Sequence, residues 1–425
     1  MDAENIKNLS NSNFLELLQI LASINPDKQK LSLAQDILTK YIDLPQSLNT
    51  SLYILSSNEP PIIRQHAANI LYKSIDHNWD DIPDTKKEEI KTKIIELYSK
   101  EKVYIILKAI GFVIFRICRK ILLENKWDSI LDLIFSSPDK YSQGQENLFE
   151  INLHIIADLV GSVSTLLKDK TRILEIKNIL STAFSQGNNK MKEHATECLG
   201  YLIQNLDTDN LDIFKDLADF LFKDLKNCDE KVISKVYETL CDCRLDVLNF
   251  FNDLENPTKV TIELLSDMNL KNNIKSMMVE FIFMISKFKK KIFTKNDSKY
   301  LKQLLKLSIE LINSEENLEN ELMDEDYLSL YNIGLNIINI LSGSISSKKT
   351  FPFLIEIIKK YIQSPKPLER KGAIAIIGEM AEGCAVPMKD NIEDIINLLI
   401  NTFSNDVDEK VKGQCIKSMD YLSQF

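Results

Sequence analysis

The stretch "PPIIRQHAANILYKSIDHNW", residues 60–79, decides how this chain folds. Two prolines open it, and proline suits the first position of a helix, where its missing N–H is not needed. Apolar residues then recur at helical spacing, for example at Ile70 and Leu71. The small residue Ala67 lies in an early turn, and Trp79 closes the stretch. The pattern predicts a helix whose one face packs very closely against its neighbours.

Three further stretches repeat this pattern of a basic residue, a small residue three positions later, and apolar residues at helical spacing. They are "KMKEHATECLGYL" (190–202), "LERKGAIAIIGEM" (368–380) and "KVKGQCIKSMDYL" (410–422). The basic residues are Arg64, Lys192, Arg370 and Lys412, and the small ones are Ala67, Ala195, Ala373 and Cys415. Their separations are close to three, four and one multiples of a unit slightly longer than 40 residues. That period matches helix-pair repeats of the HEAT or armadillo type.

Composition agrees with a chain built of helices. Of the 425 residues, 44% are hydrophobic and 27% charged, which is a globular composition, while glycine and proline number only 11 each. Alternating apolar and polar strands are not evident. A single helix pair cannot bury its apolar face alone, so neighbouring pairs must stack. We therefore predict an all-α fold, a right-handed α-solenoid of about ten HEAT-type helix pairs.

Short breaks divide the chain into helix-length segments. We place them at "NPDK" (25–28), "SSNEPP" (56–61), "SQGNN" (185–189), "QSPKP" (363–367) and "SNDVD" (404–408). The most apolar segment, "VYIILKAIGFVIF" (103–115), contains Lys108 and is followed by Arg116. It is too short and too charged to span a bilayer, so we expect a buried helix and no membrane insertion.

Charge and cysteine usage limit the function classes. The net charge of −10 repels nucleic-acid phosphate, which argues against direct nucleic-acid binding and favours basic partners. The acidic, polar start "MDAENIKNLSNSN" lacks the basic and apolar regions of a signal peptide. Seven scattered cysteines fit a reducing compartment.

No catalytic, cofactor or metal motif is expected to carry chemistry here. The nucleotide-binding and nucleophile-elbow glycine motifs are missing from the sequence, so we expect no enzyme activity and no cofactor. Cys241 and Cys243 form an isolated pair, which does not make a zinc site. The histidines are His66, His77, His154 and His194, and none has a metal-binding spacing. His66 and His194 share one repeat position, which favours a packing role.

Three charged features each allow two interpretations. The run "SEENLENELMDED" (314–326) holds seven acids in thirteen residues; it is either a solvated segment or a contact for a basic partner. "KFKKK" (287–291) is either an ordinary basic helix end or a localisation signal or partner patch. Arg64 and Arg370 either bridge to acids of adjacent repeats, the interpretation we favour, or contact a partner. For the acidic run, the residues expected to contact basic cargo are Glu319, Glu321, Asp324, Glu325 and Asp326.

The N-terminal repeats resemble importin-β-type karyopherins. The family pattern is matched by Pro26, Asp27, Ala34, Leu38, Leu52, Arg64, Gln65, Ala67, Leu71, Lys73 and Trp79. A second match, to the importin-four branch, is carried by Arg370, Lys371, Ala373, Glu382, Gly383 and Cys384. The acidic run ahead of this second match also fits that branch. The resemblance covers both ends of the chain, whereas the central repeats are diverged.

What the resemblance implies is nuclear transport of protein cargo, in the cytoplasm, in the nucleus and at the nuclear pore. Ran-GTP would bind the second helices of the first repeats, and we expect Gln65, Asn69 and Lys73 to face it. Phenylalanine–glycine nucleoporins would bind between outer helices. Basic cargo, such as ribosomal proteins or histones, would bind the inner face and the acidic run. The alternative is a HEAT-repeat scaffold or regulatory subunit of another complex.

The resemblance also implies a division of the chain and a difference in length. We expect importin-β N-terminal-like repeats over 1–120, diverged central repeats over 121–310, and the acidic segment with further repeats over 311–425. Receptors of this branch continue for many more repeats, whereas this sequence stops at "MDYLSQF". We therefore expect a fragment or a shortened relative of such a receptor.

Overall fold

The computed structural model describes residues 6–121, 127–135, 146–314 and 329–424, and every regular element in these ranges is helical. The chain divides into two compact units, residues 1–208 and 209–425. These units do not test the predicted division at 120 and 310, which rests on resemblance and stays a prediction. No helix among the described residues has the length and apolar character needed to cross a membrane.

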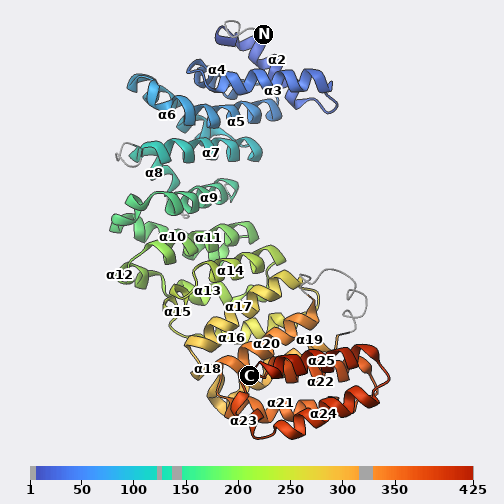
Figure 1. Ribbon diagram of the computed structural model, residues 1–425. Coiled ribbons are helices and arrows are strands. Elements are labelled where there is room, and N and C mark those ends of the chain that lie inside the picture. The colour runs from blue at the N-terminus through green and yellow to red at the C-terminus, as the bar shows by residue number, and fades with distance from the viewer. Residues whose placement is uncertain (1–5, 122–126, 136–145, 315–328, 425) are drawn as a thin grey trace. The chain divides into compact units, whose positions relative to one another are not determined.

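The first unit consists of five helix pairs, which Figure 1 shows in blue to green. They are α2 (Asn11–Ala22) with α3 (Lys28–Ile42), α4 (Gln46–Leu55) with α5 (Pro61–Asn78), α6 (Asp84–Lys100) with α7 (Tyr104–Ile121), α8 (Asp128–Ile134) with α9 (Glu146–Ser162), and α10 (Lys170–Gln186) with α11 (Asn189–Asn205). The second helices form the spine, because α5 packs on α7, α7 on α9 and α9 on α11.

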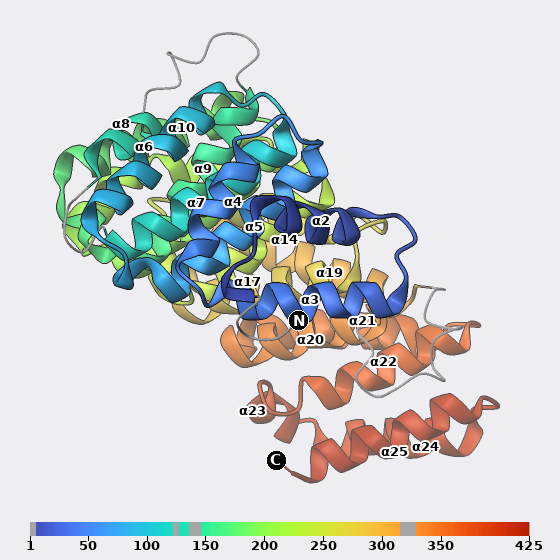
Figure 2. The same cartoon turned by 90° about the horizontal axis from the view of Figure 1, so that it is seen from above.

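Five pairs also make up the second unit. They are α13 (Leu217–Lys223) with α14 (Glu230–Asp242), α16 (Glu255–Leu265) with α17 (Asn272–Phe288), α19 (Lys299–Ile312) with α20 (Leu330–Ser344), α21 (Ser347–Tyr361) with α22 (Pro367–Glu379), and α24 (Ile392–Asn405) with α25 (Glu409–Ser423). Again the second helices pack in series, from α14 through α17, α20 and α22 to α25. Figure 2 shows α22, α24 and α25 side by side.

Short helices fill the connections between these pairs. They are η1 (Trp79–Asp81), η4 (Ser164–Lys168), α12 (Thr208–Leu211), η5 (Asp212–Phe214), η6 (Leu225–Asn227), α15 (Asp246–Phe250), α18 (Lys291–Thr294), η7 (Asn296–Ser298) and α23 (Ala385–Lys389). Ten pairs in the described part of the chain agree with the predicted number, and similarity to solved solenoids, given below, confirms the predicted fold class.

The repeat register predicted from sequence is confirmed. Arg64, Lys192, Arg370 and Lys412 lie on α5, α11, α22 and α25, which are second helices separated by three, four and one repeats. All five predicted breaks fall between helices, and the apolar segment 103–115 lies in the buried helix α7. The small residues of the pattern, Ala67, Ala195, Ala373 and Cys415, are fully or almost fully buried.

Local sequence explains where the second helices begin. Proline occupies the first position of α5 and α22, as Pro61 and Pro367. Elsewhere an Asp or Asn side chain accepts hydrogen bonds from the free N–H groups of the first turn. Asp27 accepts one from Gln29 at 2.8 Å, and Asp408 one from Lys410 at 2.9 Å. Ser329 does the same at α20, whereas α17 follows Lys271 and has no side-chain cap, so a fixed φ or a filled cap marks most of the second helices and not all of them.

Close packing between second helices depends on small residues. At Gly111 of α7, an added Cβ would lie 2.8 Å from Cγ2 of Ile151 on α9, so a larger residue would push these helices apart. Gly383, part of the importin-four-like motif, follows α22. A Cβ there would lie 2.2 Å from the carbonyl carbon of Ser342 on α20. The glycine of this motif is thus required by direct backbone contact.

Candidate functional site

Helix α5 presents a polar stripe opposite its packed face. Ile63, Ala67, Ile70 and Leu71 are buried, as the helical spacing predicts. The candidate Ran-binding residues lie on the other side: Asn69 and Lys73 are exposed, and Gln65 is half-buried. Because the stripe consists of every fourth residue, its three polar side chains lie on one face of the helix. A partner could contact them together.

Arg64 does not belong to this stripe. Its Nε donates to the carbonyl of Leu55 at 2.9 Å, and its Nη2 lies 2.5 Å from Oε2 of Glu101. Glu101 follows α6, so this ion pair joins one repeat to the next. Both side chains are largely buried, with exposed fractions of 16% for Arg64 and 8% for Glu101. Burial alone would raise the pKa of Glu101, but hydrogen bonds from Val103 N–H and Arg64 and the Arg64 charge hold it below its usual value.

Arg370 occupies the equivalent position on α22 and makes the equivalent bridge. Its Nε and Nη2 donate to the two carboxylate oxygens of Asp406, at 2.7 and 2.8 Å. Nη1 donates to the carbonyls of Ser364 and Pro365. The favoured interpretation, that both arginines bridge to acids of adjacent repeats, agrees with these contacts.

More ion pairs link α5 to α7 near their C-terminal ends. Arg116 of α7 lies 3.0 Å from the carboxylate of Asp76 on α5, and Lys120 lies 3.0 Å from that of Asp80 in η1, directly after α5. The guanidinium of Arg116 also stacks on the ring of Tyr72 at 4.3 Å. These contacts order the flank of α5 and leave Asn69 and Lys73 outside the network.

A surface groove of about 890 Å³ runs between α4 and α6, the first helices of two successive pairs. Leu52 and Tyr53 supply its apolar wall, and charged side chains of α6, such as Glu89 and Lys93, supply the opposite wall. Tyr53 is 59% exposed, which is unusual for an aromatic residue in a helix-packed protein. The groove exists because second helices pack tightly while these first helices stand apart.

The structure describes the basic run, whereas nearly all of the acidic run lies outside the described residues. Glu319, Glu321, Asp324, Glu325 and Asp326, the candidate cargo residues, lie outside the described residues. "KFKKK" spans the end of α17 and the start of α18, with Lys287 in the last turn of α17. A basic residue there complements the helix dipole, as the ordinary interpretation requires. A groove of about 510 Å³ lined by Phe288, Lys289 and Phe251 adjoins it.

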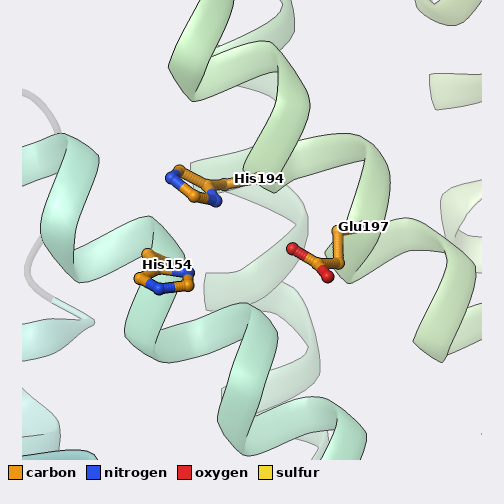
Figure 3. Close-up of side chains that lie close together, drawn as sticks. All are labelled: His154, His194 and Glu197. Carbon is orange, nitrogen blue, oxygen red and sulfur yellow. The ribbon is translucent and has the colours of Figure 1, made fainter. Parts of the chain in front are cut away.

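One cluster of metal-ligating residue types lies between α9 and α11. Figure 3 shows His154 and His194 stacked, with Glu197 directed toward both. Their ring centroids are 4.4 Å apart, and one ligand atom from each of the three residues lies within 4.8 Å of the others. Burial, His194 and Lys108 lower the pKa of His154 to about 4, so its imidazole is neutral at pH 7. Burial and Glu197 raise the pKa of Asp158 to about 6.

Sequence reasoning missed this cluster for an identifiable reason. His154 and His194 are one repeat apart, a spacing that no single-helix metal motif contains. The signal was present in the repeat alignment, because residues one repeat apart on adjacent second helices become neighbours. The assignment of His194 to packing is compatible with its stacking on His154.

Comparison with known proteins shows what these features resemble. The importin-β N-terminal domain matches residues 34–100, which contain α5 and its polar stripe. A probable importin subunit beta-4 of Schizosaccharomyces pombe is 24% identical over 93% of this chain and 37% of its own length. This chain therefore spans about two fifths of the relatives it matches.

Solved structures give the same fold. The crystal structure of Kap121p matches with a TM-score of 0.77 and 16% identity, over 99% of this chain and 41% of that one. Kap121p bound to Nup53p matches with a TM-score of 0.75 and 15% identity, over all of this chain and 41% of that one. At such identity the structural match establishes the fold, a HEAT-repeat solenoid. Together with the N-terminal domain match, this makes the chain similar to importin-β-type karyopherins in both sequence and fold.

Proposed function

We propose that this chain acts in nuclear transport, carrying protein cargo through nuclear pores under the control of Ran-GTP. The observation that carries the proposal is the importin-β N-terminal domain match over residues 34–100. It coincides with the exposed stripe of α5, in a scaffold that stacks repeat on repeat. The proposed function consists of binding and releasing protein cargo, and it involves no chemical step. Such a receptor would act in the cytoplasm, in the nucleus and at the pore between them.

The proposed Ran-GTP surface is the polar stripe of α5. Asn69 and Lys73 support it, because both are exposed and neither takes part in the ion-pair network that fixes the flank of the helix. A lysine on a mobile stem suits a contact with an acidic protein surface. Arg64 suits this role less well, because its guanidinium already bonds to Leu55 and Glu101.

The direct test is a pull-down of the full chain with Ran locked in its GTP or GDP form. We expect selective retention of the GTP form, and loss of at least about tenfold in affinity for Lys73→Glu, which corresponds to roughly 1.4 kcal/mol. Lys100→Glu makes the same charge change on α6, where Lys100 is 74% exposed, and should bind as the parent does. Equal binding of both nucleotide forms, or none, would refute Ran control.

The proposed nucleoporin site is the groove between α4 and α6. Kap121p has been solved bound to Nup53p, which is a statement about that protein. Here the support is Tyr53, an exposed aromatic beside Leu52 at the groove wall. Phenylalanine–glycine repeats insert aromatic rings, so an aromatic-lined groove suits them. Tyr53→Ser should weaken retention on such repeats. Ile24→Ser removes another exposed apolar residue, which lies between α2 and α3 and is 96% exposed, and serves as the control.

Basic cargo is proposed to bind through the acidic run 314–326. Seven acids in thirteen residues repel one another, so folding stability does not explain them. Their field would reach a lysine-rich cargo over about 8 Å at physiological salt. Neutral polar replacements of Glu319, Glu321, Asp324, Glu325 and Asp326 should slow association more than they speed dissociation, since steering acts on encounter. Unchanged binding of histone tails and ribosomal-protein segments would place the cargo site elsewhere.

Release is proposed to arise from competition between cargo and Ran-GTP. Coupling of this kind needs two sites and a scaffold whose arrangements favour one ligand over the other, and it must be reciprocal. Saturating basic cargo should therefore weaken Ran-GTP by the same factor by which Ran-GTP weakens cargo. If neither ligand affects the other and Ran binds in neither form, the alternative of a HEAT-repeat scaffold in another complex is favoured.

A further inference from the structure

The histidine–glutamate cluster brings nitrogen and oxygen donors of two successive second helices together. His154 comes from α9, and His194 and Glu197 come from α11, where they are three residues apart and so share one face. All three side chains converge on one point in Figure 3. Asp158, one turn after His154, places its Oδ2 3.9 Å from Nε2 of His154.

One ring nitrogen of the cluster lacks a hydrogen-bond partner among the described residues. Nδ1 of His154 is buried and has no hydrogen-bond partner among the described residues. A buried ring nitrogen without a partner is unfavourable, because it has lost its hydrogen bonds to water. Phe112, which meets the His154 ring edge-on at 5.5 Å, offers it no hydrogen bond. This ring nitrogen is therefore not occupied by a hydrogen bond within the described part of the chain.

The donors fit a borderline divalent cation. Two imidazoles and a carboxylate are the ligands of zinc sites, in which the fourth position is filled by water or another side chain. Here the three residues supply three ligands, which leaves the fourth position to water, while Asp158 lies beside Nε2 of His154. Oxygen-preferring cations such as magnesium suit this set poorly, because they favour carboxylates and water over imidazole.

The charge around the cluster also fits a cation. Glu197 and Asp158 face one another closely enough for the Glu197 charge to act on Asp158, and Glu150 lies within electrostatic reach of His154. Lys108 is the opposing group, since its charge acts on His154 as well. Lys190 lies 3.7 Å from Glu150 and offsets its charge, so Glu197 and Asp158 face Lys108 and the environment stays net negative. A cation would relieve the repulsion between the two facing carboxylates.

Binding requires a modest rearrangement. Ligand atoms in a tetrahedral zinc site lie about 3.4 Å apart, given zinc–nitrogen bonds of about 2.0–2.1 Å. The present limit is 4.8 Å. The rings are also stacked at an interplanar angle of 29°, whereas a bound ion must lie in the plane of each ring. The rearrangement that the site requires is a rotation of one of the two half-buried imidazoles toward the ion.

We propose that His154, His194 and Glu197 form a zinc-class metal site that ties α9 to α11. Such an ion would fix the separation of two successive second helices in the first unit. Its effect would be local stiffening of the spine between the fourth and fifth helix pairs. Zinc is the probe because the donor set is mixed nitrogen and oxygen.

The test is a zinc titration of the full chain freed of any histidine tag, followed by calorimetry and by thermal unfolding. We expect one equivalent to bind at micromolar concentration or tighter and to raise the unfolding temperature. Glu197→Gln preserves the side-chain shape and should weaken binding at least about tenfold, the scale seen when a metal site loses a supporting group. His194→Gln should do the same.

The matched control is His66→Gln. His66 occupies the same repeat position as His194, but on α5, and it belongs to no metal-ligating cluster found among the described residues. It should bind zinc as the parent does. Cobalt provides a second readout, because ligation by histidine and carboxylate gives no thiolate charge-transfer band. Such a band would assign the binding to half-buried Cys228 or Cys241 and overturn the proposal, as would undiminished binding in Glu197→Gln and His194→Gln or none at micromolar zinc.

Discussion

Arg64 and Arg370 occupy the same repeat position in the two units, yet they hold their neighbours differently. Arg370 donates hydrogen bonds to both carboxylate oxygens of Asp406, whereas Arg64 donates to one oxygen of Glu101 and to one backbone carbonyl. The acids differ too. Glu101 also accepts from the N–H groups of Lys102 and Val103, and Asp406 from that of Asp408. One repeat position therefore supports a common bridge whose strength is set by the acid's other partners.

Among the substitutions that test this difference between the two arginines, Arg370→Met is expected to have the largest effect on stability. Asp406, only 6% exposed, would then keep the backbone N–H of Asp408 as a hydrogen-bond donor, with that of Val407 also acting on its carboxylate. Removing one partner of a buried ion pair costs about 3–5 kcal/mol, and this pair lies at the lower end because Arg370 is 14% exposed. We expect α22 and α25 to open about 3 kcal/mol more easily, measured by hydrogen exchange of the full chain. Unchanged exchange there, with the bridge removed, would contradict the assignment.

Arg64→Met should cost less, about 2 kcal/mol, because a buried ion pair is again broken but fewer bonds are lost. Glu101 keeps two backbone donors, at 3.0 and 2.9 Å, after the arginine is gone. Hydrogen exchange should rise in α5, α6 and α7 and stay unchanged in α22 and α25. Ran-GTP binding measured on the same variant separates the two roles. A loss of Ran binding with normal exchange would make Arg64 a contact residue after all.

How far the sequence predicts these bridges depends on the repeat. The basic residue, the small residue and the unit length are recurrent, so α5, α11, α22 and α25 and their buried faces could be predicted. Glu101 and Asp406 could not be named, since each lies in a connection whose path the period leaves open. The short helices α15, α18 and α23 were not predicted for the same reason. They have five residues or fewer, and an apolar period cannot be recognised over so few positions.

The candidate sites also differ in how far the sequence predicts them. Asn69 and Lys73 follow from helical spacing alone, because a buried face at Ile63, Ala67 and Ile70 leaves them exposed. The groove at Tyr53 depends on the distance between α4 and α6, which spacing within one helix cannot give. The cluster at His154 and His194 needs the repeat register and the rotation of both helices.

A third prediction concerns pH. Asp406 has a lowered pKa, held down first by the hydrogen bond from Arg370 and opposed by burial; Glu101 is lowered as well. An acid with a lowered pKa in the folded state stabilises the fold above its unfolded value of about 4. That stabilisation is lost as pH falls through the folded pKa. The difference in opening free energy between parent and Arg370→Met should therefore shrink as pH falls from about 5 toward 3. A constant difference would show that Asp406 is not the partner that matters.

The smallest expected effect, and the sharpest comparison, comes from replacing each arginine by lysine. Lysine keeps the charge but loses the planar fork, so it cannot bond both oxygens of Asp406 and the carbonyls of Ser364 and Pro365 together. At Arg64 only one carboxylate oxygen and one carbonyl are involved, so less is lost. We expect Arg370→Lys to cost about 1 kcal/mol and Arg64→Lys about half that, in line with one or two lost hydrogen bonds. Opening free energies from hydrogen exchange at α22 and α5 give the two values in one experiment. If the two substitutions cost the same, the bidentate geometry contributes nothing beyond charge, and the difference between the two repeats must lie in the acids and not in the arginines.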